Sequence, residues 1–368
     1  MGLIEIRRRE YGLLACRVLF SASEQEESGI VHGKVSFREN YGTCISNISF
    51  SFTFITFPDI LAALMRSRHL SRPLRGIIPP MVTPLDGPAS LDRAGLERLI
   101  EHMIGGGVHG IFILGTTGEG PALSYRLRRE LIDRTCAQVA GRVPVLVGIT
   151  DTSYEESCGL AHYASNAGAD AVVTAPPFYF AVSQSDLFHL VQRLASEVEL
   201  PLFLYNMPSL TKACFAPETV LRAAELLNVY GLKDSSGELG YLRAIATRMA
   251  DRPEFTLLVG PEELLLDSLA IGAHGGVTGG ANLFPRLFVT LYEAAIKGDM
   301  QQAAHLQSRV RELGELLYGI GEAESSYLRG LKLGLELMGI CKSTLALPYV
   351  SADSRRHETL GEILKEYA

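Results

Sequence analysis

From Leu74 onward, hydrophobic positions fall into short apolar runs that alternate with longer amphipathic stretches. The runs show little alternation of apolar and polar residues, which is typical of parallel strands buried on both faces. Eight such runs, each followed by a helical stretch, occupy residues 76–85, 110–115, 144–150, 171–177, 201–208, 229–237, 256–263 and 275–280. Eight successive β/α units predict a (β/α)8 TIM barrel, an α/β fold that commonly spans about 250 residues.

Boundary signals at the ends of the helical stretches agree with this arrangement. Ser153 is followed three residues later by Glu156, the spacing of an N-terminal capping box. Further N-caps are expected at Asp92, Ser124 and Ser185. Helices are expected to end at the glycines of residues 105–107 and at Gly168. A doubly wound open sheet is the competing architecture, but no Gly-x-Gly-x-x-Gly follows the first run.

The strand pattern ends after Lys297, and the rest of the chain reads as helices. Three are predicted, over residues 299–319, 322–338 and 355–367. We therefore expect a barrel over residues 71–298 and a C-terminal three-helix appendage within 299–368, serving as a packing or oligomer surface.

Residues 1–70 show poor periodicity and no clean helix boundaries, and this N-terminal extension is left unassigned. Met65 lies just ahead of the point where the regular pattern begins. One hypothesis is that Met65 is the natural start and that residues 1–64 are absent from the native protein. If the segment is present, we expect it to be disordered.

Composition and charge narrow the classes of function. Apolar residues make up 47% of the 368 residues, and the net charge is −7 at pH 7, so no basic field is available for nucleic acid. The six cysteines and nine histidines lack the spacings of a zinc site or a disulfide framework, which indicates a reducing compartment and no metal. The run at residues 45–65 is too polar to span a membrane and no signal peptide is evident, so we expect a cytoplasmic protein.

Reactive side chains occur where three of the predicted strands end, at the barrel face that carries active sites. Residues 115–119 read Gly-Thr-Thr-Gly-Glu, whose hydroxyls and backbone amides suit a carboxylate, although a plain glycine-rich turn is the alternative. Tyr205 ends the fifth strand, either as a packed core residue or as a reactive phenol. Lys233 lies in the sixth strand, where a buried lysine would be a neutral amine nucleophile unless it reaches solvent or pairs with Asp234. Together these features fit imine chemistry on a 2-oxo acid.

The sequence resembles the dihydrodipicolinate synthase / N-acetylneuraminate lyase family of class I pyruvate-dependent aldolases, from about Leu74 to the C-terminus. The resemblance rests on four blocks in order: Gly-Thr-Thr-Gly-Glu at 115–119, Tyr-Asn-Met-Pro at 205–208, Gly-Leu-Lys-Asp-Ser-Ser-Gly at 231–237 and Gly-Gly-Val-Thr-Gly-Gly-Ala-Asn at 275–282.

The resemblance implies a role for each matching residue. Lys233 would form a Schiff base with pyruvate, so no other cofactor would be needed, and Tyr205 would move protons. Thr116 and Thr117 would hold the carboxylate, Thr116 also joining the proton relay. Two further residues are implied: the Val277 carbonyl close to pyruvate, and Tyr179, which either reaches into a neighbouring subunit's site or is a simple interface aromatic. The family also implies a homotetramer built as a dimer of dimers.

Departures from the family pattern bear on the substrate. Leu210 stands where the lysine-biosynthetic branch has an arginine that grips a carboxylate, which disfavours 4-hydroxy-tetrahydrodipicolinate synthase. Ser235, Glu262 and Glu263 match hydroxyl-binding positions of the sialic acid lyase branch, although the two acids could instead cap a helix. We therefore expect a lyase that cleaves or forms a 2-keto-3-deoxy sugar acid or an N-acetylneuraminate-like 2-oxo acid. A 2-keto-3-deoxy acid dehydratase uses the same imine and stays open.

Two other classes of function are kept in view. Residues 272–280 could form the phosphate-binding loop of another barrel enzyme. A non-catalytic metabolite-binding barrel is the third reading, and it predicts a degraded nucleophile, whereas Lys233, Tyr205 and Thr116 are all present.

Overall fold

The computed structural model describes residues 70–318 and 326–350, five positions between 360 and 367, and the backbone of four strands nearer the N-terminus. The chain forms two compact units, Met1–Arg68 and His69–Ala368. The first unit contains an antiparallel sheet of β1 (Gly2–Glu5), β2 (Arg17–Ala22), β3 (Val31–Arg38) and β4 (Ile48–Phe52), paired in that order. Met65 lies outside the described residues, so the hypothesis about the natural start stays a prediction.

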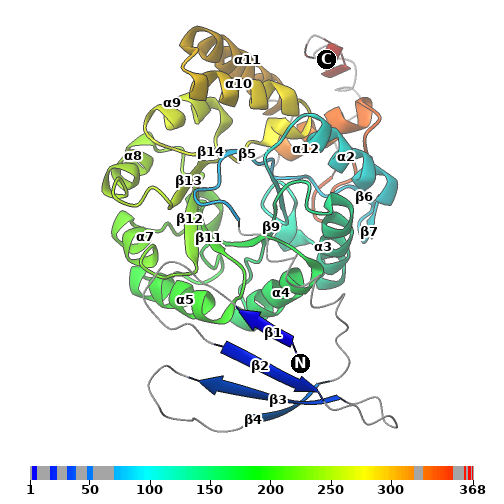
Figure 1. Ribbon diagram of the computed structural model, residues 1–368. Coiled ribbons are helices and arrows are strands. Elements are labelled where there is room, and N and C mark those ends of the chain that lie inside the picture. The colour runs from blue at the N-terminus through cyan, green and yellow to red at the C-terminus, as the bar shows by residue number, and fades with distance from the viewer. Residues whose placement is uncertain are drawn as a thin grey trace. The chain divides into compact units, whose positions relative to one another are not determined.

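The second unit is a parallel eight-stranded barrel (Figure 1). Its strands are β5 (Gly76–Ile77), β8 (Ile111–Ile113), β9 (Val145–Gly148), β10 (Ala171–Thr174), β11 (Leu202–Asn206), β12 (Val229–Asp234), β13 (Thr256–Val259) and β14 (Gly275–Gly276). They pair in the order β5-β14-β13-β12-β11-β10-β9-β8. The chain after β5 closes the ring, because Phe112 N donates to Pro79 O at 3.0 Å and Met81 N donates to Phe112 O at 2.8 Å. The predicted TIM barrel is confirmed.

Each strand is shorter than its predicted apolar run, because the last residues of a run leave the ladder and form the loops above the barrel. A hairpin of β6 (Leu85–Gly87) and β7 (Ser90–Leu91) follows β5. The helices that follow are α2 (Arg93–Gly105), α3 (Tyr125–Val139), α4 (Tyr154–Ala167), α5 (Gln184–Glu197), α6 (Pro208–Thr211), α7 (Pro217–Ala223), α8 (Leu239–Arg248), α9 (Leu265–Ala270), α10 (Pro285–Lys297), α11 (Met300–Tyr318) and α12 (Ser326–Leu337). Three 3₁₀ turns, η1 (Gly120–Ala122), η2 (Glu262–Leu264) and η3 (Gly279–Asn282), lie between them.

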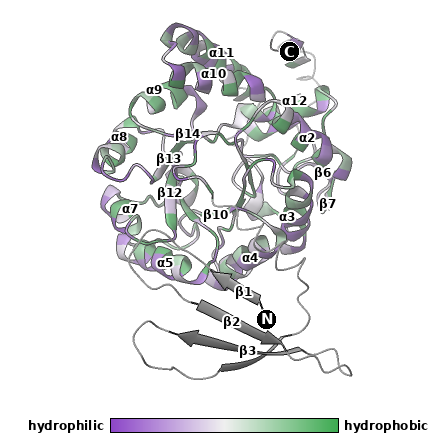
Figure 2. Ribbon diagram, in the orientation of Figure 1, coloured by the Kyte–Doolittle hydropathy of each residue, from purple (hydrophilic) through white to green (hydrophobic). Residues whose placement is uncertain are grey.

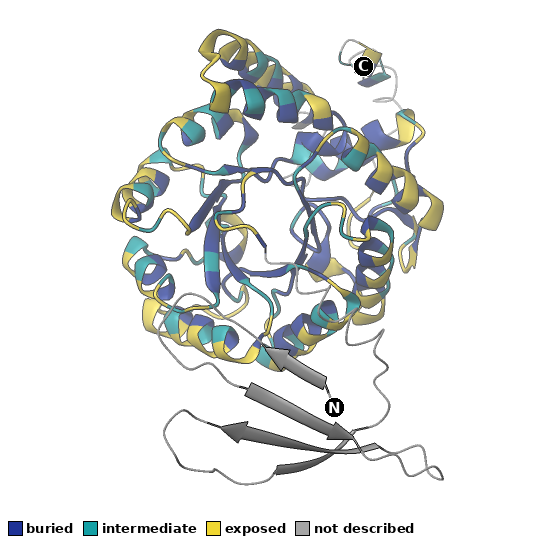
Figure 3. Ribbon diagram, viewed as in Figure 1, coloured by how far each residue is buried: buried dark blue, intermediate teal, exposed yellow. Residues whose placement is uncertain are grey.

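The helices bury one face against the sheet and leave the other in solvent. In α5 the buried residues are Leu187, Val191 and Leu194, the spacing of one helical stripe. Figure 2 shows apolar and polar residues mixed along each helix, and Figure 3 shows buried strands inside a ring of helices with exposed outer faces. Hydrophobic burial between helices and strands is therefore the main stabilising layer.

A second, smaller hydrophobic cluster fills the interior of the barrel. Its members include Phe112, Leu146, Val173, Phe203 and Leu258, contributed by five of the strands. Because these side chains fill the interior, the barrel is not an open channel. A site at the carboxyl ends of the strands would therefore lie on top of this packed cluster.

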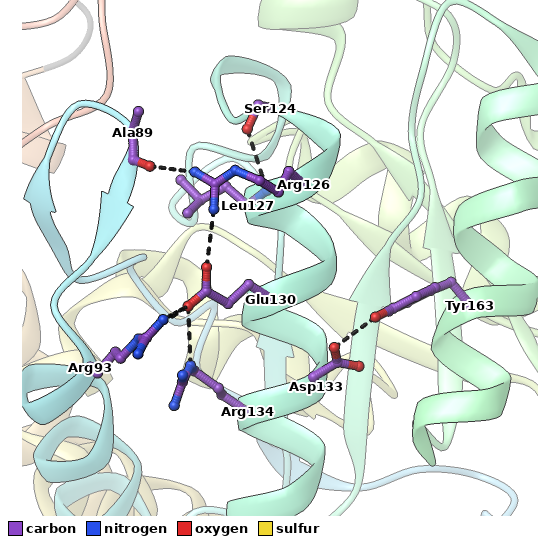
Figure 4. A network of polar contacts seen from close by, with 9 residues as sticks. All are labelled: Ala89, Arg93, Ser124, Arg126, Leu127, Glu130, Asp133, Arg134 and Tyr163. Atoms are coloured by element: carbon purple, nitrogen blue, oxygen red, sulfur yellow. Dashed lines mark hydrogen bonds and ion pairs between the residues drawn. The ribbon is translucent and has the colours of Figure 1, made fainter.

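Polar contacts tie neighbouring helices together on the outer surface (Figure 4). Glu130 of α3 accepts from Arg93 of α2, with Nη2 and Oε1 2.8 Å apart, and also pairs with Arg126 and Arg134 of its own helix. Burial raises the pKa of Glu130, but the guanidinium hydrogen bonds outweigh it and hold that pKa below its usual value. Exposed pairs of this kind add little stability each.

Most of the predicted helix boundaries are confirmed, and one is wrong. Asp92 and Ser124 accept from the backbone N–H three residues ahead, and Gly168 ends α4 with a φ of +91°. Ser185 does not cap α5, because Ser183 forms a complete capping box with Asp186. Ser153 caps α4, because its Oγ accepts from Glu156 N. In the predicted capping box the Glu156 side chain would accept from the Ser153 N–H, but that N–H donates to Asp151 Oδ1 at 3.0 Å instead.

The C-terminal region begins as predicted, with α11 packed on α10 and α12 packed on α11 and η3. The third predicted helix falls largely outside the described residues. A buried ion pair fixes α12 to the barrel: the Lys332 ammonium pairs with Glu119, and both side chains are fully buried. Lys332 Nζ also donates to Thr344 O at 2.6 Å, and Ala346 N donates to Glu119 Oε2 at 2.7 Å. The C-terminal segment is therefore anchored on the loop that follows β8.

We expect Lys332→Met to destabilise the protein by about 3–5 kcal/mol, because it leaves the Glu119 carboxylate buried without a partner. Adding Glu119→Gln should recover most of that loss. Urea denaturation measures both. The control is Lys342→Met, which breaks an ion pair with Asp86 whose two side chains are about half exposed and should cost about 0–1 kcal/mol. A Lys332→Met variant as stable as the wild type would contradict this role.

Candidate active site

A cavity of about 760 Å³ opens above the carboxyl ends of the strands. One part of its wall comes from strand ends and the loops after them: Phe112, Leu114, Gly115, Thr116, Glu119, Pro121, Ala122, Gly148, Thr150, Ala175, Phe178, Tyr205, Met207, Leu210 and Thr211. The other part comes from the C-terminal segment: Tyr327, Leu328, Leu347, Pro348 and Tyr349. The helical region was predicted only as a packing or oligomer surface, and the structure makes it a wall of the site.

Lys233 lies on β12, in register with Tyr205 of β11 and Leu258 of β13. Its side chain is 5% exposed, and its Nζ lies 3.9 Å from the centroid of the Tyr205 ring and 5.1 Å from that of Phe112. Burial lowers the pKa of Lys233, and the nearby Tyr205 hydroxyl only partly opposes this. The surroundings therefore favour the neutral amine, the form that attacks a carbonyl.

Asp234, the next residue, does not neutralise Lys233, because successive side chains of a strand point to opposite faces. Asp234 Oδ1 accepts from Asn206 Nδ2 at 2.8 Å, and its Oδ2 accepts from Ser236 Oγ at 2.9 Å. Asn206 Oδ1 also accepts from Phe215 N at 3.1 Å. These bonds join the ends of β11 and β12, and so fix Tyr205 relative to Lys233.

The Thr116–Thr117 pair sits in a sharp turn after β8. Leu114 has a φ of +60° and Glu119 a φ of +56°, a left-handed conformation that non-glycine residues rarely adopt. A Cβ on Gly120 would lie 2.2 Å from Leu114 O, so only glycine allows the loop to fold back this closely. The turn places Thr116 Oγ1 3.1 Å from the Tyr205 hydroxyl.

The structure thus brings Thr116, Tyr205 and Lys233 together: Thr116 and Tyr205 line the cavity, and Lys233 contacts the Tyr205 ring but is not itself a lining residue. Val277 belongs to the same interior cluster as Tyr205. Ser235 is half-buried at the end of β12, where its N–H donates to Asn206 O at 2.8 Å. Neither Val277 nor Ser235 is among the residues that line the cavity.

Glu262 and Glu263, expected to hold substrate hydroxyls, do not line the cavity. β13 ends at Val259, and the chain then turns into η2. Glu262 is buried, and its Oε2 accepts from Gly280 N at 2.8 Å, which ties η2 to the loop after β14. Glu263 is exposed. This placement gives no geometric support to a substrate-binding role for either acid.

Tyr179 lies outside the cavity of its own chain. It is 80% exposed and packs edge-on against Phe180, with ring centroids 5.0 Å apart. With Phe180, which is 77% exposed, it forms a contiguous exposed aromatic pair, which fits either interpretation made from the sequence.

Neither metal ligands nor membrane spans were found in the part of the chain that the structure describes. No group of three or more His, Cys, Asp or Glu side chains there is placed to hold a metal ion. No described helix combines the length and the apolar character needed to cross a membrane.

The comparisons with known proteins agree with this geometry. The family model described as "Dihydrodipicolinate synthetase family" matches residues 73–367. The chain belongs to this family. It is therefore a lyase of the aldolase type, built on the family's (β/α)8 barrel.

Individual relatives of this dihydrodipicolinate synthetase family member carry different activities in their names. A probable 2-dehydro-3-deoxy-D-pentonate aldolase of Escherichia coli K12 is 34% identical over 275 residues, covering 74% of this chain and 90% of that protein. A 4-hydroxy-tetrahydrodipicolinate synthase of Methanopyrus kandleri is 34% identical over 295 residues, covering 80% and 96%.

Solved structures of the family superpose on most of the chain. A dihydrodipicolinate synthase from Bacteroides thetaiotaomicron is 50% identical, with a TM-score of 0.78 over 80% of this chain and 99% of that one. The prophage protein YagE of E. coli K12, solved in complex with pyruvate, is 30% identical, with a TM-score of 0.75 over 80% and 98%. A dihydrodipicolinate synthase variant described as monomeric is 28% identical, with a TM-score of 0.76 over 82% and 99%.

We expect Lys233→Met to raise the free energy of unfolding at pH 7 by about 1–2 kcal/mol, because it removes an amine that burial penalises. The folded-state pKa of Lys233 lies below its unfolded value, so the wild type gains stability as pH rises between the two, and the difference should shrink toward pH 10. Urea denaturation of both proteins across this pH range measures the difference in their free energies of unfolding. Lys297→Met, at an exposed pair with Glu293, should change stability little; a destabilised Lys233→Met variant would contradict the assignment.

Proposed function

We propose that the protein is a Schiff-base-forming aldolase that joins pyruvate to an aldehyde, or runs the same reaction in reverse. The observation that carries this is the Lys233 amine, buried without an ion-pair partner among the described residues and in contact with the Tyr205 ring. The amine attacks the carbonyl carbon of pyruvate and water leaves, giving an imine. Loss of a proton from the methyl carbon gives an enamine, which adds to the aldehyde. Water then hydrolyses the imine and frees Lys233.

Tyr205 and Thr116 serve the proton transfers of this sequence. Their hydroxyls are 3.1 Å apart, and the Tyr205 ring lies against Nζ of Lys233. Tyr205 can therefore pass a proton to the departing water and to the new alkoxide. In this proposal Thr116, Thr117 and the amides of their turn receive the carboxylate, and the Val277 carbonyl is close to the bound pyruvate. The lysine imine supplies the electron sink, so no separate cofactor takes part.

A 2-keto-3-deoxy sugar acid is the substrate class that fits this cavity best. Its retro-aldol cleavage releases pyruvate and a neutral hydroxyaldehyde. The cavity wall carries the hydroxyl side chains of Thr150, Thr211 and Tyr349, while its carboxylate, Glu119, is paired with Lys332. The pentonate aldolase name of one relative supports the same class.

4-Hydroxy-tetrahydrodipicolinate synthase is the alternative activity, because several relatives carry that name. It needs an aldehyde that bears a carboxylate. Leu210 lines the cavity where an arginine would bind that group, and the Lys212 ammonium donates to Ser209 O at 2.6 Å instead. The dehydratase alternative shares the imine and differs only in the bond that breaks.

Self-association is also part of this proposal, with a homotetramer as the expected form. The exposed aromatic run of Phe178, Tyr179 and Phe180 supports a contact between copies of the chain, through which Tyr179 reaches a neighbouring site.

Borohydride reduction in the presence of pyruvate, followed by peptide mass spectrometry, tests the mechanism. We expect one reduced adduct, on Lys233, and none in Lys233→Arg. Tyr205→Phe should still be trapped at saturating pyruvate, but its kcat should fall about 10²–10³-fold because proton transfer is lost. A folded wild-type protein that gives no adduct on Lys233 would overturn the proposed function.

A substitution at Leu210 tests the substrate class. The wild type should prefer neutral hydroxyaldehydes to carboxylate-bearing aldehydes as partners of pyruvate. Leu210→Arg should raise kcat/KM for a carboxylate-bearing aldehyde about tenfold, because it adds the missing charged contact. Leu210→Met, which keeps the apolar wall, is the control. A wild type that already prefers the carboxylate-bearing aldehyde would support the synthase instead.

A further inference from the structure

A short segment after α12 forms part of the cavity wall. Residues 344–350, called the C-terminal strap below, contribute Leu347, Pro348 and Tyr349 to the lining of the cavity. The proposed chemistry uses side chains from the ends of β8, β11 and β12, and it gives the strap no task. The strap therefore contacts the substrate cavity without a role in the steps described so far.

Buried bonds fix the strap to the turn that carries Thr116. Ala346 is fully buried, and its N–H donates to Glu119 Oε2 at 2.7 Å. Lys332 Nζ donates to Thr344 O at 2.6 Å and forms the buried ion pair with the same carboxylate. Glu119 is the last residue of the Gly-Thr-Thr-Gly-Glu sequence that contains Thr116. The position of the strap is therefore set by the same loop that helps to form the reactive end of the site.

The backbone on both sides of Tyr349 is held as well. Tyr349 N donates to Ala346 O at 3.0 Å, and Arg329 Nε donates to Val350 O at 2.9 Å. The Tyr349 side chain is nevertheless 38% exposed and lines the cavity. A side chain on such a fixed backbone loses little freedom when it binds a ligand, so more of its interaction energy remains for recognition.

The Tyr349 hydroxyl differs from the two threonine hydroxyls of the wall in being unused. Thr211 Oγ1 donates to two backbone carbonyl oxygens, at 3.0 and 2.7 Å. Thr150 Oγ1 accepts from Ala175 N at 2.9 Å. The Tyr349 hydroxyl forms no hydrogen bond with any residue that the structure describes. A phenol both donates and accepts, so it can bond to a substrate hydroxyl in either direction.

The exposed part of the cavity wall is otherwise apolar. Among the described residues that line the cavity, Tyr349 is the one exposed residue with a polar side-chain atom. The other exposed lining residues are Pro121, Ala122, Phe178, Leu210, Leu347 and Pro348. Apolar contacts are not directional, whereas a hydrogen bond selects for the position of its partner. Directional recognition at the outer part of the cavity therefore falls to the Tyr349 phenol.

We infer that Tyr349 is a specificity-determining residue, whose hydroxyl forms a hydrogen bond with a hydroxyl group on the aldehyde half of the substrate. This inference deepens the proposed function and rests on it, because it presumes a 2-keto-3-deoxy sugar acid bound through Lys233. The preference for a hydroxyaldehyde over the same aldehyde without hydroxyls then depends on one phenol of the strap.

The test compares pairs of aldehydes of equal carbon number, with pyruvate saturating and the full-length protein. Glyceraldehyde is paired with propanal, and erythrose with butanal. The quantity measured is the ratio of kcat/KM for the hydroxyaldehyde to kcat/KM for its unsubstituted partner. Tyr349→Phe should lower this ratio about 3–10-fold in at least one pair, because one hydrogen bond to the substrate is lost.

Two control variants separate the hydroxyl contact from other effects. Leu347→Ala changes the same strap without removing a hydroxyl, and Tyr163→Phe removes a hydroxyl bonded to Asp133 on the outer helices. Both should leave the ratio within about twofold of the wild type. The pyruvate concentration that gives half-maximal borohydride trapping on Lys233 should be the same in Tyr349→Phe as in the wild type, because the contact is made to the aldehyde.

The outcomes distinguish this inference from the proposed function. A wild type that is trapped at Lys233, together with a Tyr349→Phe variant that keeps the wild-type ratio in both pairs, would overturn this inference alone. The same holds if Tyr349→Phe weakens pyruvate trapping and leaves the ratio unchanged. A trapped wild type that uses neither hydroxyaldehyde would contradict the substrate class and this inference with it. A folded wild type that is not trapped would overturn the proposed function itself.

Discussion

Burial of the Lys233 amine without a counter-ion is the constraint on which the rest of the site depends. A charged ammonium in that position would be desolvated among Phe112, Tyr205 and Leu258, so the fold favours the neutral form. The barrel makes this possible because its interior is a packed hydrophobic cluster that keeps water away from the lower side of the amine. In the proposed mechanism, the burial that destabilises the charged amine also favours the neutral form, which can attack a carbonyl.

Two buried polar connections keep that arrangement rigid. The first joins Asn206 to Asp234 across the ends of β11 and β12 and sets Tyr205 beside Lys233. The second is the ion pair of Glu119 with Lys332, which joins the β8 loop to α12. Side chains that are locked by such bonds lose little freedom when substrate binds, which is how a barrel turns separate strand ends into one site.

The barrel could be predicted from the sequence because each strand and helix leaves a local signal. Apolar runs with little alternation marked the eight strands, and Ser124 or Gly168 marked helix ends. The prediction of a cap at Ser185 was wrong because it passed over the stronger signal two residues earlier. Ser183 has an acidic residue three positions later, which is the spacing of a capping box. Lys233, Tyr205 and Thr116 could also be found, because strand-end residues of a barrel meet at one face.

The parts of the site that the sequence did not reveal depend on long-range contacts. Tyr327 lies more than two hundred positions from Thr116 along the chain, and nothing near it in the sequence indicates that the two line the same cavity. A weak signal existed in Lys332, a lysine inside the apolar helix α12, whose partner Glu119 lies in the very loop that was singled out. The substrate role expected for Glu262 and Glu263 came only from the resemblance to the sialic acid lyase branch, and it stays a prediction; no signal in the sequence indicated that Glu262 accepts from the backbone of Gly280.

The ionisation of Lys233 in the folded protein is the most direct measure of this account. NMR titration of the side-chain amine, in protein carrying isotope-labelled lysine and with Lys233→Arg to assign the signal, reports it. The account predicts that the Lys233 amine titrates below the ordinary lysine value of 10.5 and that its signal moves to that of an imine when pyruvate is added. A Lys233 that titrates at or above the ordinary value and does not respond to pyruvate would contradict it.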